Sequence, residues 1–406
     1  MDLTPRRFRL LFLLPFPPRL HGRHGGANVT GQLIDGLARR HDVAALYLTK
    51  PEEPRVDEEL RGLCGLLEGV ESQWNPERLR SRIGAKTALL RGIPTWASEL
   101  AEPRFAARAK ELAGAWRPDV VQLEYPVMGQ YLPALDRCPA PRVLVDHEAS
   151  VRDLRQFPGR LGRVTGALDE RAWRRFERWV IERVQAAVVF TDRGRRALEE
   201  LGASTQVVQI PFGTPLPDSP SDPVGGSPPA VLFVGNFTHP PNADAALWLG
   251  TELFPAVRGA QPDARLVIVG PSPGPELRAL AGEGVVVTGE VPDVTPYVED
   301  AAVVAAPVRV GGGMRVKVLE ALAAGKAVVA TPLAAEGLDV TPGDQLEIAE
   351  TEDDFRRVLT HLLSEEEARR ALGTRARAWA AEHLGWSAAI GRYDALYDSL
   401  VAGERP

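Results

Sequence analysis

The sequence contains very little cysteine. Cys64 and Cys138 are the only two cysteines among 406 residues, and they lie far apart without the spacing of a metal-ligating pair. A disulfide framework or a cysteine-ligated zinc site needs more cysteines at closer spacing. The composition therefore favours a protein of a reducing compartment, and we expect the cytoplasm.

Neither a basic surplus nor a membrane-spanning run is present. The formal net charge is -6, whereas proteins that bind nucleic acids generally carry excess Lys and Arg against the phosphates. No nucleic-acid partner is therefore expected. No segment reaches the roughly 20 apolar residues that cross a bilayer. The run FRLLFLLPF at residues 8–16 is short and broken by Arg9 and Pro15, and it predicts a first β-strand rather than a signal peptide.

Short apolar runs alternate with longer helical patterns along the whole chain. This alternation is typical of parallel sheets whose strands are joined by crossover helices. Strands are expected at residues 9–14, 43–48, 119–124, 142–146, 186–190 and 206–210, and again at 230–235, 265–270, 284–288, 301–307 and 327–331. The chain is therefore expected to be α/β, with two facing Rossmann-like domains and a cleft lined by the carboxyl ends of their strands.

A segment rich in Pro, Gly and Ser separates the two halves. Residues 212–229 can hardly form the interior of a helix or a strand, which predicts a domain linker. The first domain is then expected at residues 1–211 and the second at residues 230–385. A C-terminal helix at residues 386–406 could pack back on the first domain.

In the second half, a strand, a glycine turn and the start of a helix follow one another directly. The turn comprises residues 311–313, and the helix is expected at residues 314–324. Free N–H groups and the positive dipole end of a helix attract anions, and glycine lets a phosphate approach the main chain closely. Arg315 and Lys317 are unfavourable beside that positive end unless an anion is present. They therefore indicate a diphosphate site.

Glu320 lies one turn further along the same helix. Its carboxylate can accept two hydrogen bonds from the vicinal hydroxyls of a sugar or a ribose. The alternative is structural, because Lys317 and Glu320 could form an ordinary i,i+3 surface pair after a flexible turn. The helix pattern alone does not separate the two interpretations.

The run VRVGGGMRVKVLEALAAG at residues 308–325 resembles the C-terminal signature of the family 4-like retaining glycosyltransferases of the GT-B fold (glycosyl transferases group 1). Further similar pieces follow in order, namely VVQIPFGTPLP, VLFVGNFTHPPNADAALWLGTELFP, DARLVIVG, VVVTGEVPDVTPYVEDAAVVAAP and AVVATPLAAEGL. The resemblance implies transfer of a hexose from a UDP- or GDP-sugar to a glycan or lipid-linked glycan, with retention of configuration, in cell-surface or exopolysaccharide synthesis. The nucleotide sugar is a substrate, so no cofactor is implied.

The resemblance also implies roles for individual residues. Arg315 and Lys317 would contact the donor diphosphate, and His147 would lie beside the transferring sugar; these three form the expected catalytic set. The expected donor-binding residues are Gly26, Gly235, Asn236, His239, Gly311, Gly312, Gly313, Met314 and Glu320. The expected acceptor-side residues are His24, Asn28, Glu124 and Tyr125. For His147 and for the glycine turn that precedes the helix at about residues 27–40, the alternative is a purely structural role.

Two departures from the family pattern stand out. The family's Glu eight residues before Glu320 is replaced by Gly312, which leaves recognition of the sugar unassigned. An Arg and a Lys after the first strand of the second domain are replaced within GNFTHPPN. Arg315 would supply the missing charge, and His239 or Asn242 could reach the donor instead. The alternatives are a helix N-cap for Asn242 and a loop position for His239.

No Asp-x-Asp pair occurs in the sequence, so the metal-dependent GT-A mechanism lacks its carboxylates. We therefore expect a metal-independent enzyme without a metal site. Arg315, Lys317 and backbone dipoles would stabilise the charge on the leaving diphosphate.

Residues 160–183 are rich in Arg and aromatic residues at helical spacing. This segment could make a peripheral contact with the anionic inner face of the membrane. The alternative is a core-packed helix with a solvated basic face. Two competing functions also remain, a UDP-sugar 2-epimerase of the same architecture and a non-catalytic scaffold.

Overall fold

The computed structural model describes residues 6–20, 25–50, 56–73, 87–147, 159–202, 205–312 and 314–403, without the side chains of residues 159–163. His24 and Gly313, two of the expected site residues, lie outside the described residues. The chain forms two compact units. Unit 1 comprises Met1–Ile210 and Ala389–Pro406, and unit 2 comprises Pro211–Ala388.

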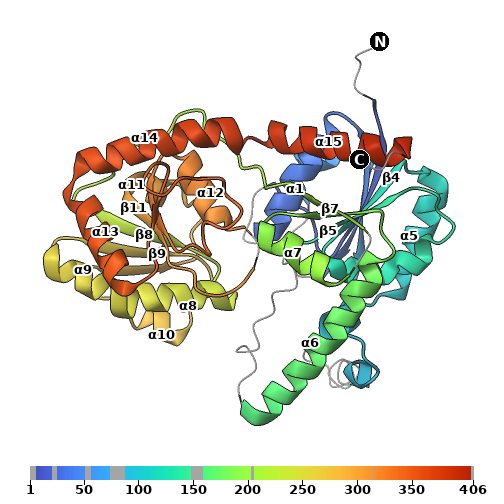
Figure 1. Cartoon of the computed structure of the whole chain (residues 1–406), viewed down its shortest axis with the longest axis horizontal. Coiled ribbons are helices and arrows are strands. Elements are labelled where there is room, and N and C mark those ends of the chain that lie inside the picture. Colours follow the sequence, from blue (N-terminus) through green and yellow to red (C-terminus); the bar gives the residue numbers. More distant parts are fainter. Residues whose placement is uncertain are drawn as a thin grey trace. The chain divides into compact units, whose positions relative to one another are not determined.

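Unit 1 is built on a seven-stranded parallel sheet in the order β3-β2-β1-β4-β5-β6-β7 (Figure 1). Its strands are β1 (Arg9–Leu14), β2 (Asp42–Thr49), β3 (Leu66–Glu71), β4 (Val120–Glu124), β5 (Arg142–Val145), β6 (Ala186–Val189) and β7 (Gln206–Gln209). Its helices are α1 (Gly25–Ala38), α2 (Glu58–Leu63), α4 (Thr95–Glu99), α5 (Pro103–Trp116), η1 (Pro126–Leu135), α6 (Gly159–Ile181), α7 (Asp192–Glu200) and most of α15 (Trp386–Ala402).

Unit 2 has a six-stranded parallel sheet in the order β10-β9-β8-β11-β12-β13. Its strands are β8 (Ala230–Val234), β9 (Arg265–Val269), β10 (Val285–Gly289), β11 (Ala301–Ala306), β12 (Ala327–Ala330) and β13 (Glu347–Ile348). Its helices are α8 (Pro240–Trp248), η3 (Leu249–Leu253), α9 (Phe254–Ala260), α10 (Pro275–Arg278), α11 (Thr295–Asp300), α12 (Val316–Ala323), α13 (Glu352–Ser364) and α14 (Glu366–His383).

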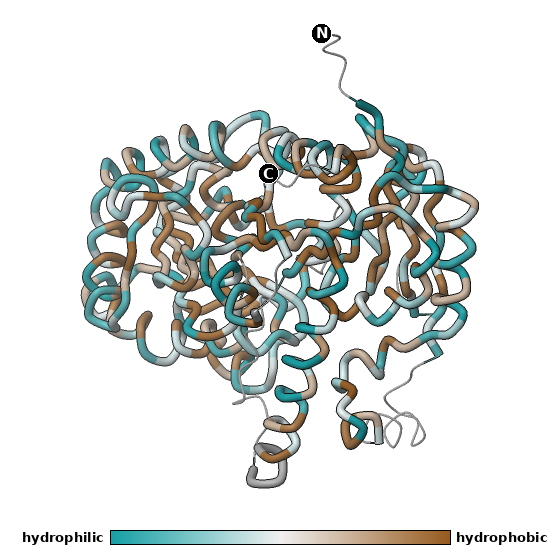
Figure 2. Tube along the Cα trace, turned by 45° about the vertical axis from the view of Figure 1, so that its right-hand side comes forward, coloured by the Kyte–Doolittle hydropathy of each residue, from teal (hydrophilic) through white to brown (hydrophobic). Residues whose placement is uncertain are grey.

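The central strands are apolar because helices cover both faces of each sheet. Every residue of β6 and β11 is buried, as in other parallel sheets that have no solvated face. Figure 2 shows the hydrophobic residues concentrated in the strands and on the inner sides of the helices. All the strands expected from the sequence are present, and their ends differ from the expected ones by no more than one residue.

The edge strands β3 and β13 were missed by the sequence analysis. Strand β3, LLEGVE, contains Glu68 and Gly69 and is only partly buried, so it lacks the apolar run of a central strand. Pairing with β2 holds this strand in the sheet despite its composition. Gly69 lies opposite Tyr47, and a Cβ on Gly69 would lie 2.6 Å from the Tyr47 ring. Tertiary contacts therefore override weak local propensity at this edge.

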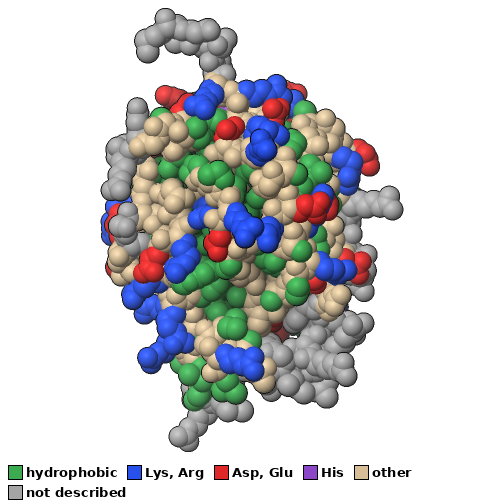
Figure 3. Space-filling view, turned by 90° about the vertical axis from the view of Figure 1, so that its right-hand side faces the viewer, with side chains coloured by type: hydrophobic (Ala, Val, Ile, Leu, Met, Phe, Trp, Pro, Cys, Tyr) green, Lys and Arg blue, Asp and Glu red, His purple; other side chains and the backbone are tan. Residues whose placement is uncertain are grey.

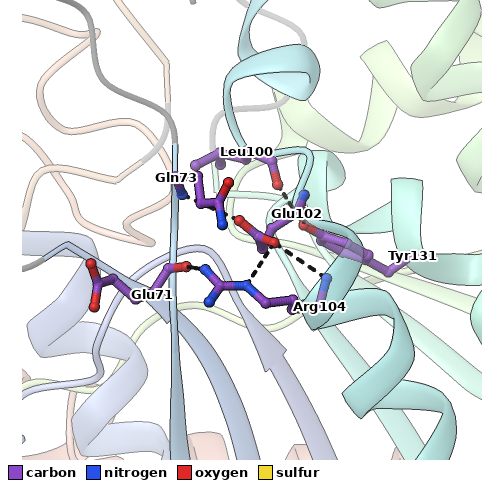
Figure 4. A network of polar contacts seen from close by, with 6 residues as sticks. All are labelled: Glu71, Gln73, Leu100, Glu102, Arg104 and Tyr131. Carbon is purple, nitrogen blue, oxygen red and sulfur yellow. Dashed lines mark hydrogen bonds and ion pairs between the residues drawn. The ribbon is translucent and has the colours of Figure 1, made fainter.

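A buried carboxylate ties the end of β3 to the start of α5 (Figure 4). Glu102, which is 5% exposed, accepts hydrogen bonds from the N–H groups of Arg104 at 3.3 Å and Gln73 at 3.2 Å. The Arg104 guanidinium donates to the Glu71 carbonyl at 2.6 Å. Tyr131 accepts from the Glu102 N–H at 3.1 Å and donates to the Leu100 carbonyl. The network satisfies backbone groups at the end of β3 and around the start of α5.

The segment expected to be a linker, residues 212–229, is instead part of unit 2. The Ser221 N–H donates to the Ala324 carbonyl at 2.9 Å. The fully buried Lys326 donates to the Asp222 carbonyl, and also to the carbonyls of Glu299 and Ala301 at 2.9 and 2.8 Å. Composition correctly excluded regular structure in this segment, but it gave no sign of these long-range hydrogen bonds.

Helix α15 begins in unit 2 and contributes its residues from Ala389 onward to unit 1. Asp394 accepts from His41 at 2.8 Å and pairs with Arg40 at 2.9 Å. Three helical positions further on, the buried Tyr397 donates to the side-chain carbonyl of Gln122 in β4. The last helix thus completes the packing of the first sheet.

We expect Lys326→Met to destabilise unit 2 by roughly 3 kcal/mol, because three carbonyls lose the cationic donor that they share. Urea denaturation curves would measure the change. Lys110→Met, at an exposed position of α5, is the matched control and should change stability by less than about 0.5 kcal/mol. Equal denaturation midpoints for the two variants would show that Lys326 does not hold the segment.

Candidate functional site

Strands β8 and β11 are neighbours in the unit 2 sheet, and the order of the strands reverses between them. Strands β9 and β10 continue the sheet on one side, and β12 and β13 on the other. The loops that leave β8 and β11 therefore diverge at the carboxyl edge, which is where open α/β sheets bind ligands. The expected donor-binding residues of unit 2 lie in these two loops and at the starts of α8 and α12.

The Lys317 ammonium lies at the centre of this group. It donates to Asn242 Oδ1 at 2.7 Å and sits 4.1 Å from the centre of the Phe233 ring. Burial and the positive charge of Arg315 lower the pKa of Lys317 to about 7, and Glu320 opposes this change. An anion placed beside the ammonium would stabilise its charged form and raise that pKa again.

Asn242 is not a helix N-cap. His239 occupies the cap position of α8 without a capping side-chain bond, and Asn242 is the third residue of the helix. The Asn242 amide donates to the Asn236 carbonyl at 3.0 Å, so its oxygen is turned toward Lys317. A Cβ on Gly235 would approach the Asn242 side chain to 3.0 Å, which explains the glycine at this position. Asn236 uses its own side-chain oxygen within the loop, where it accepts from Thr238.

The glycine turn after β11 is closed by Arg315. Gly311 has a φ of 99°, a conformation that favours glycine. Arg315 precedes α12 rather than lying in its first turn, and its guanidinium donates to the carbonyls of Gly312 and Val310. Met314 is buried, and its sulfur accepts from the Phe212 N–H at 3.4 Å, so this side chain packs in the core of unit 2.

Glu320 lies one turn into α12 and is exposed. Surrounding protein raises the pKa of Glu320 to about 7, and Lys317 opposes this change. Water that reaches the exposed carboxyl reduces the amount by which the surrounding protein raises this pKa. The simple i,i+3 surface pair does not describe this helix, because the Lys317 ammonium bonds to Asn242 in α8.

In unit 1 the expected residues also gather where neighbouring strands end. Glu124 is the last residue of β4, and His147 follows β5, which pairs with β4. Glu124 Oε2 lies 2.6 Å from His147 Nε2. Tyr125 stacks on the His147 ring, with centroids 4.0 Å apart. Glu124 and Tyr125 are buried, so they contact His147 rather than lying open to an acceptor.

Gly26 and Asn28 lie in the first turn of α1, which the sequence placed about two residues further along the chain. Helix α1 follows β1, and β1 pairs with β4. Both residues are half-buried. The start of α1 and the ends of β4 and β5 therefore belong to the same edge of the unit 1 sheet.

Two family models match the chain in successive pieces. Residues 24–213 match a glycosyl transferase 4-like domain, and residues 228–365 match glycosyl transferases group 1. The chain belongs to the group 1 glycosyltransferases. A relative from Mycolicibacterium smegmatis, a phosphatidyl-myo-inositol mannosyltransferase, is 28% identical over 232 residues. The match covers 54% of this chain and 58% of the relative, so it spans little more than half of that enzyme.

Solved structures show that this group 1 glycosyltransferase has the GT-B fold. Sucrose-phosphate synthase from Thermosynechococcus elongatus superimposes with a TM-score of 0.71 at 18% identity, over 98% of this chain and 100% of that chain. HepE from Anabaena, solved with UDP and glucose, superimposes with a TM-score of 0.67 at 13% identity, over 97% of this chain and 100% of that chain. The expected α/β class with two Rossmann-like, parallel-sheet domains is confirmed.

Three residues that contact the candidate site residues, or link to them through a hydrogen bond, were not found from the sequence. Phe233, under Lys317, is an ordinary strand residue in sequence. Gln122 is a polar residue among the apolar residues of β4, two positions before Glu124, and this spacing was an available signal that both share one face. Tyr397 gave no local signal, because it lies 275 residues from the Gln122 side chain to which it bonds.

Helix α6 covers the segment for which a membrane contact was one interpretation. Trp173 is buried and stacks on Trp96 with centroids 5.5 Å apart, which agrees with a core-packed helix. Its other side carries exposed arginines that line an open hollow. On the face of unit 1 shown in Figure 3, Lys and Arg side chains lie next to exposed hydrophobic ones. None of the described helices is long and apolar enough to cross a bilayer. A peripheral contact through residues 160–183 stays a prediction.

We expect Asn242→Asp to raise the pKa of Lys317 by about one to two pH units, because a carboxylate beside the ammonium stabilises its charged form. An NMR titration of 13C-methylated lysines would measure the change. Asn242→Leu removes the oxygen without adding a charge and should not raise this pKa. An unchanged Lys317 titration in Asn242→Asp would contradict the contact.

Proposed function

We propose that the protein is a retaining, metal-independent glycosyltransferase that moves a hexose from a UDP- or GDP-sugar to a glycan or lipid-linked glycan. We further propose that it acts at the cytoplasmic side of the membrane, in cell-surface or exopolysaccharide synthesis. The observation that carries the proposal is the position of the Lys317 ammonium, which lies in the first turn of α12 and donates to Asn242. The glycine turn precedes Lys317, and Glu320 follows it by one helical turn.

The chemistry follows from where charge develops. When the bond between C1 of the sugar and the diphosphate oxygen breaks, negative charge accumulates on the leaving diphosphate. Lys317 and the N–H groups at the start of α12 supply positive charge and donors there. The acceptor oxygen forms its bond to C1 on the face that the diphosphate leaves, and its proton passes to the departing phosphate oxygen. No protein nucleophile is needed.

Arg315 and Glu320 have different parts in this proposal. Arg315 fixes the glycine turn through the Gly312 carbonyl and adds its charge beside Lys317. Glu320 accepts the ribose hydroxyls as a carboxylate. His147 takes the position beside the transferring sugar that the family resemblance implies. HepE, which shares the fold, was solved with UDP and glucose and with UDP-glucose, and these complexes support a nucleotide-sugar donor for this chain.

We expect Glu320→Ala to weaken UDP or GDP binding about tenfold or more without unfolding the protein, because a carboxylate that accepts two hydroxyls is removed from an exposed position. Isothermal titration calorimetry gives the affinity and thermal melting gives the stability. Glu367→Ala, at an exposed position in α14, is the matched control and should change neither. A large loss of stability in Glu320→Ala, with unchanged affinity, would make Glu320 a structural residue.

Affinity for UDP-glucose should be highest near pH 7, because Lys317 loses its charge above this pH and Glu320 loses its charge below it. The raised pKa of Glu320 means that its carboxylate is lost as the pH falls below about 7. The lowered pKa of Lys317 means that its positive charge is lost as the pH rises above about 7. UDP-glucose is the better probe because, unlike UDP, it has no terminal phosphate that titrates in this range.

Calorimetry from pH 5.5 to pH 8.5 would test this profile. Lys317→Arg should remove the decline at high pH, since the guanidinium stays charged. Glu320→Gln should flatten the decline at low pH. A pH-independent affinity in the native protein would contradict the assignment of both groups.

Product analysis separates the competing functions. A UDP-sugar 2-epimerase would convert its substrate without an acceptor, whereas the proposed enzyme releases the nucleotide diphosphate. A scaffold would bind neither UDP nor GDP, and Lys317→Ala would then leave the glycans of the cell unchanged.

A further inference from the structure

A continuous set of hydrogen bonds runs through unit 1 from the last helix to His147. The Tyr397 hydroxyl donates to Gln122 Oε1. Gln122 Nε2 donates to Glu124 Oε1 at 2.6 Å, and Glu124 Oε2 lies 2.6 Å from His147 Nε2. All four side chains are buried, and Glu124 is 0% exposed. We call these four residues the His147 relay.

With Glu124 as a carboxylate, each hydrogen bond of the relay has one direction. A carboxylate only accepts, so the Gln122 amide must turn its nitrogen toward Glu124 and its oxygen toward Tyr397. Burial, together with the nearby Tyr393 and Glu124, raises the pKa of Tyr397 well above its ordinary value, so its hydroxyl keeps the proton that it donates. The same carboxylate requires a proton on Nε2 of His147. The relay therefore selects one tautomer of the neutral ring.

Aromatic contacts fix the plane of the same ring. Tyr125 stacks on His147 at 4.0 Å with an angle of 6° between the planes, and Phe190 meets the ring edge-on at 5.0 Å. Tyr125 takes a φ of 70° to reach this position, which is uncommon for a residue other than glycine and costs about 1 kcal/mol. The surroundings of His147 thus determine both its proton and its orientation.

Stability alone does not account for the relay. Gln122 and Glu124 alternate with apolar residues in β4, and apolar side chains at their positions would avoid the cost of burying a carboxylate. Helix α15 also has a separate polar anchor in unit 1. Asp394 accepts from His41 Nε2 at 2.8 Å, while His41 Nδ1 accepts from the Phe8 N–H at 3.3 Å.

We propose that Tyr397, Gln122 and Glu124 are positioning residues that hold His147 in one tautomer and one orientation. Helix α15 then contributes a positioning residue, Tyr397, to the unit 1 site, in addition to packing on the sheet. This inference deepens the proposed function and rests on it for the role of His147 at the donor sugar. The effect of the relay on the ring itself does not depend on that role.

The decisive experiment combines NMR with kinetics on the full chain. Two-bond 1H–15N spectra of 15N-histidine-labelled protein report which ring nitrogen carries the proton, and His147→Gln assigns the signal. The kinetic probe is the hydrolysis of UDP-glucose or GDP-mannose, whichever the protein hydrolyses faster. The variants are Tyr397→Phe, Glu124→Gln and the matched control Asp394→Asn, which weakens the other anchor of α15.

We expect His147 to carry its proton on Nε2 in the native protein and to lose this preference in Glu124→Gln. Tyr397→Phe should lower kcat about tenfold, through misorientation of His147, with KM changed less than about twofold. Asp394→Asn should lower the thermal stability about as much as Tyr397→Phe while leaving the His147 signal and kcat unchanged. Tyr397→Phe keeps the ring and its packing, so it should still fold.

Two results would overturn the inference. One is an unchanged His147 tautomer in Glu124→Gln. The other is an equal loss of kcat in Tyr397→Phe and Asp394→Asn, which would make the relay a docking contact for α15. If the native protein binds and hydrolyses no sugar nucleotide, the proposed function fails, and the NMR comparison alone then decides whether the relay positions His147.

Discussion

Parallel pairing of the strands is the constraint on which both candidate sites depend. Since every strand in a sheet points the same way, each loop that follows a strand leaves at one edge, and residues far apart in sequence meet there. In unit 2 this brings Asn242, after β8, to Lys317, after β11. In unit 1 it brings Glu124, at the end of β4, to His147, after β5. Neither contact could form if one of its strands were reversed.

The same constraint explains which parts of the structure could be predicted. A central parallel strand is buried on both faces, so it must be a nearly continuous apolar run, and such runs located the central strands closely. The edge strand β3 has no such requirement. Its Glu68 and Gly69 are tolerated because β2 and the Glu102 network hold it in place. Residues 212–229 were excluded from regular structure by composition, yet their attachment to unit 2 depends on Lys326, which lies about a hundred positions away.

The candidate sites show a similar division. Chemical type and local spacing pointed to Lys317 and Glu320, because charged residues beside a glycine turn are visible in sequence, and the family resemblance pointed to His147. The sequence did not show how the side chains at these sites are oriented. Arg315 faces the carbonyls of its own turn, and Asn242 faces Lys317 rather than capping α8. These arrangements depend on which side-chain donors and acceptors meet after folding, and a single sequence does not contain that pairing.

The two sites use polar groups in opposite ways. At the start of α12, the lowered pKa of Lys317 and the raised pKa of Glu320 mean that each charged form is disfavoured in the ligand-free protein. A bound anion would restore the charge of Lys317, so the free energy of binding would include a change of protonation. The four residues of the His147 relay are already joined by hydrogen bonds, so their order does not depend on a ligand. Unit 2 would therefore respond to the charge of the nucleotide, whereas unit 1 would present a histidine whose geometry is fixed in advance. This difference follows from burial, because the relay lies within the sheet core, while Glu320 remains open to water.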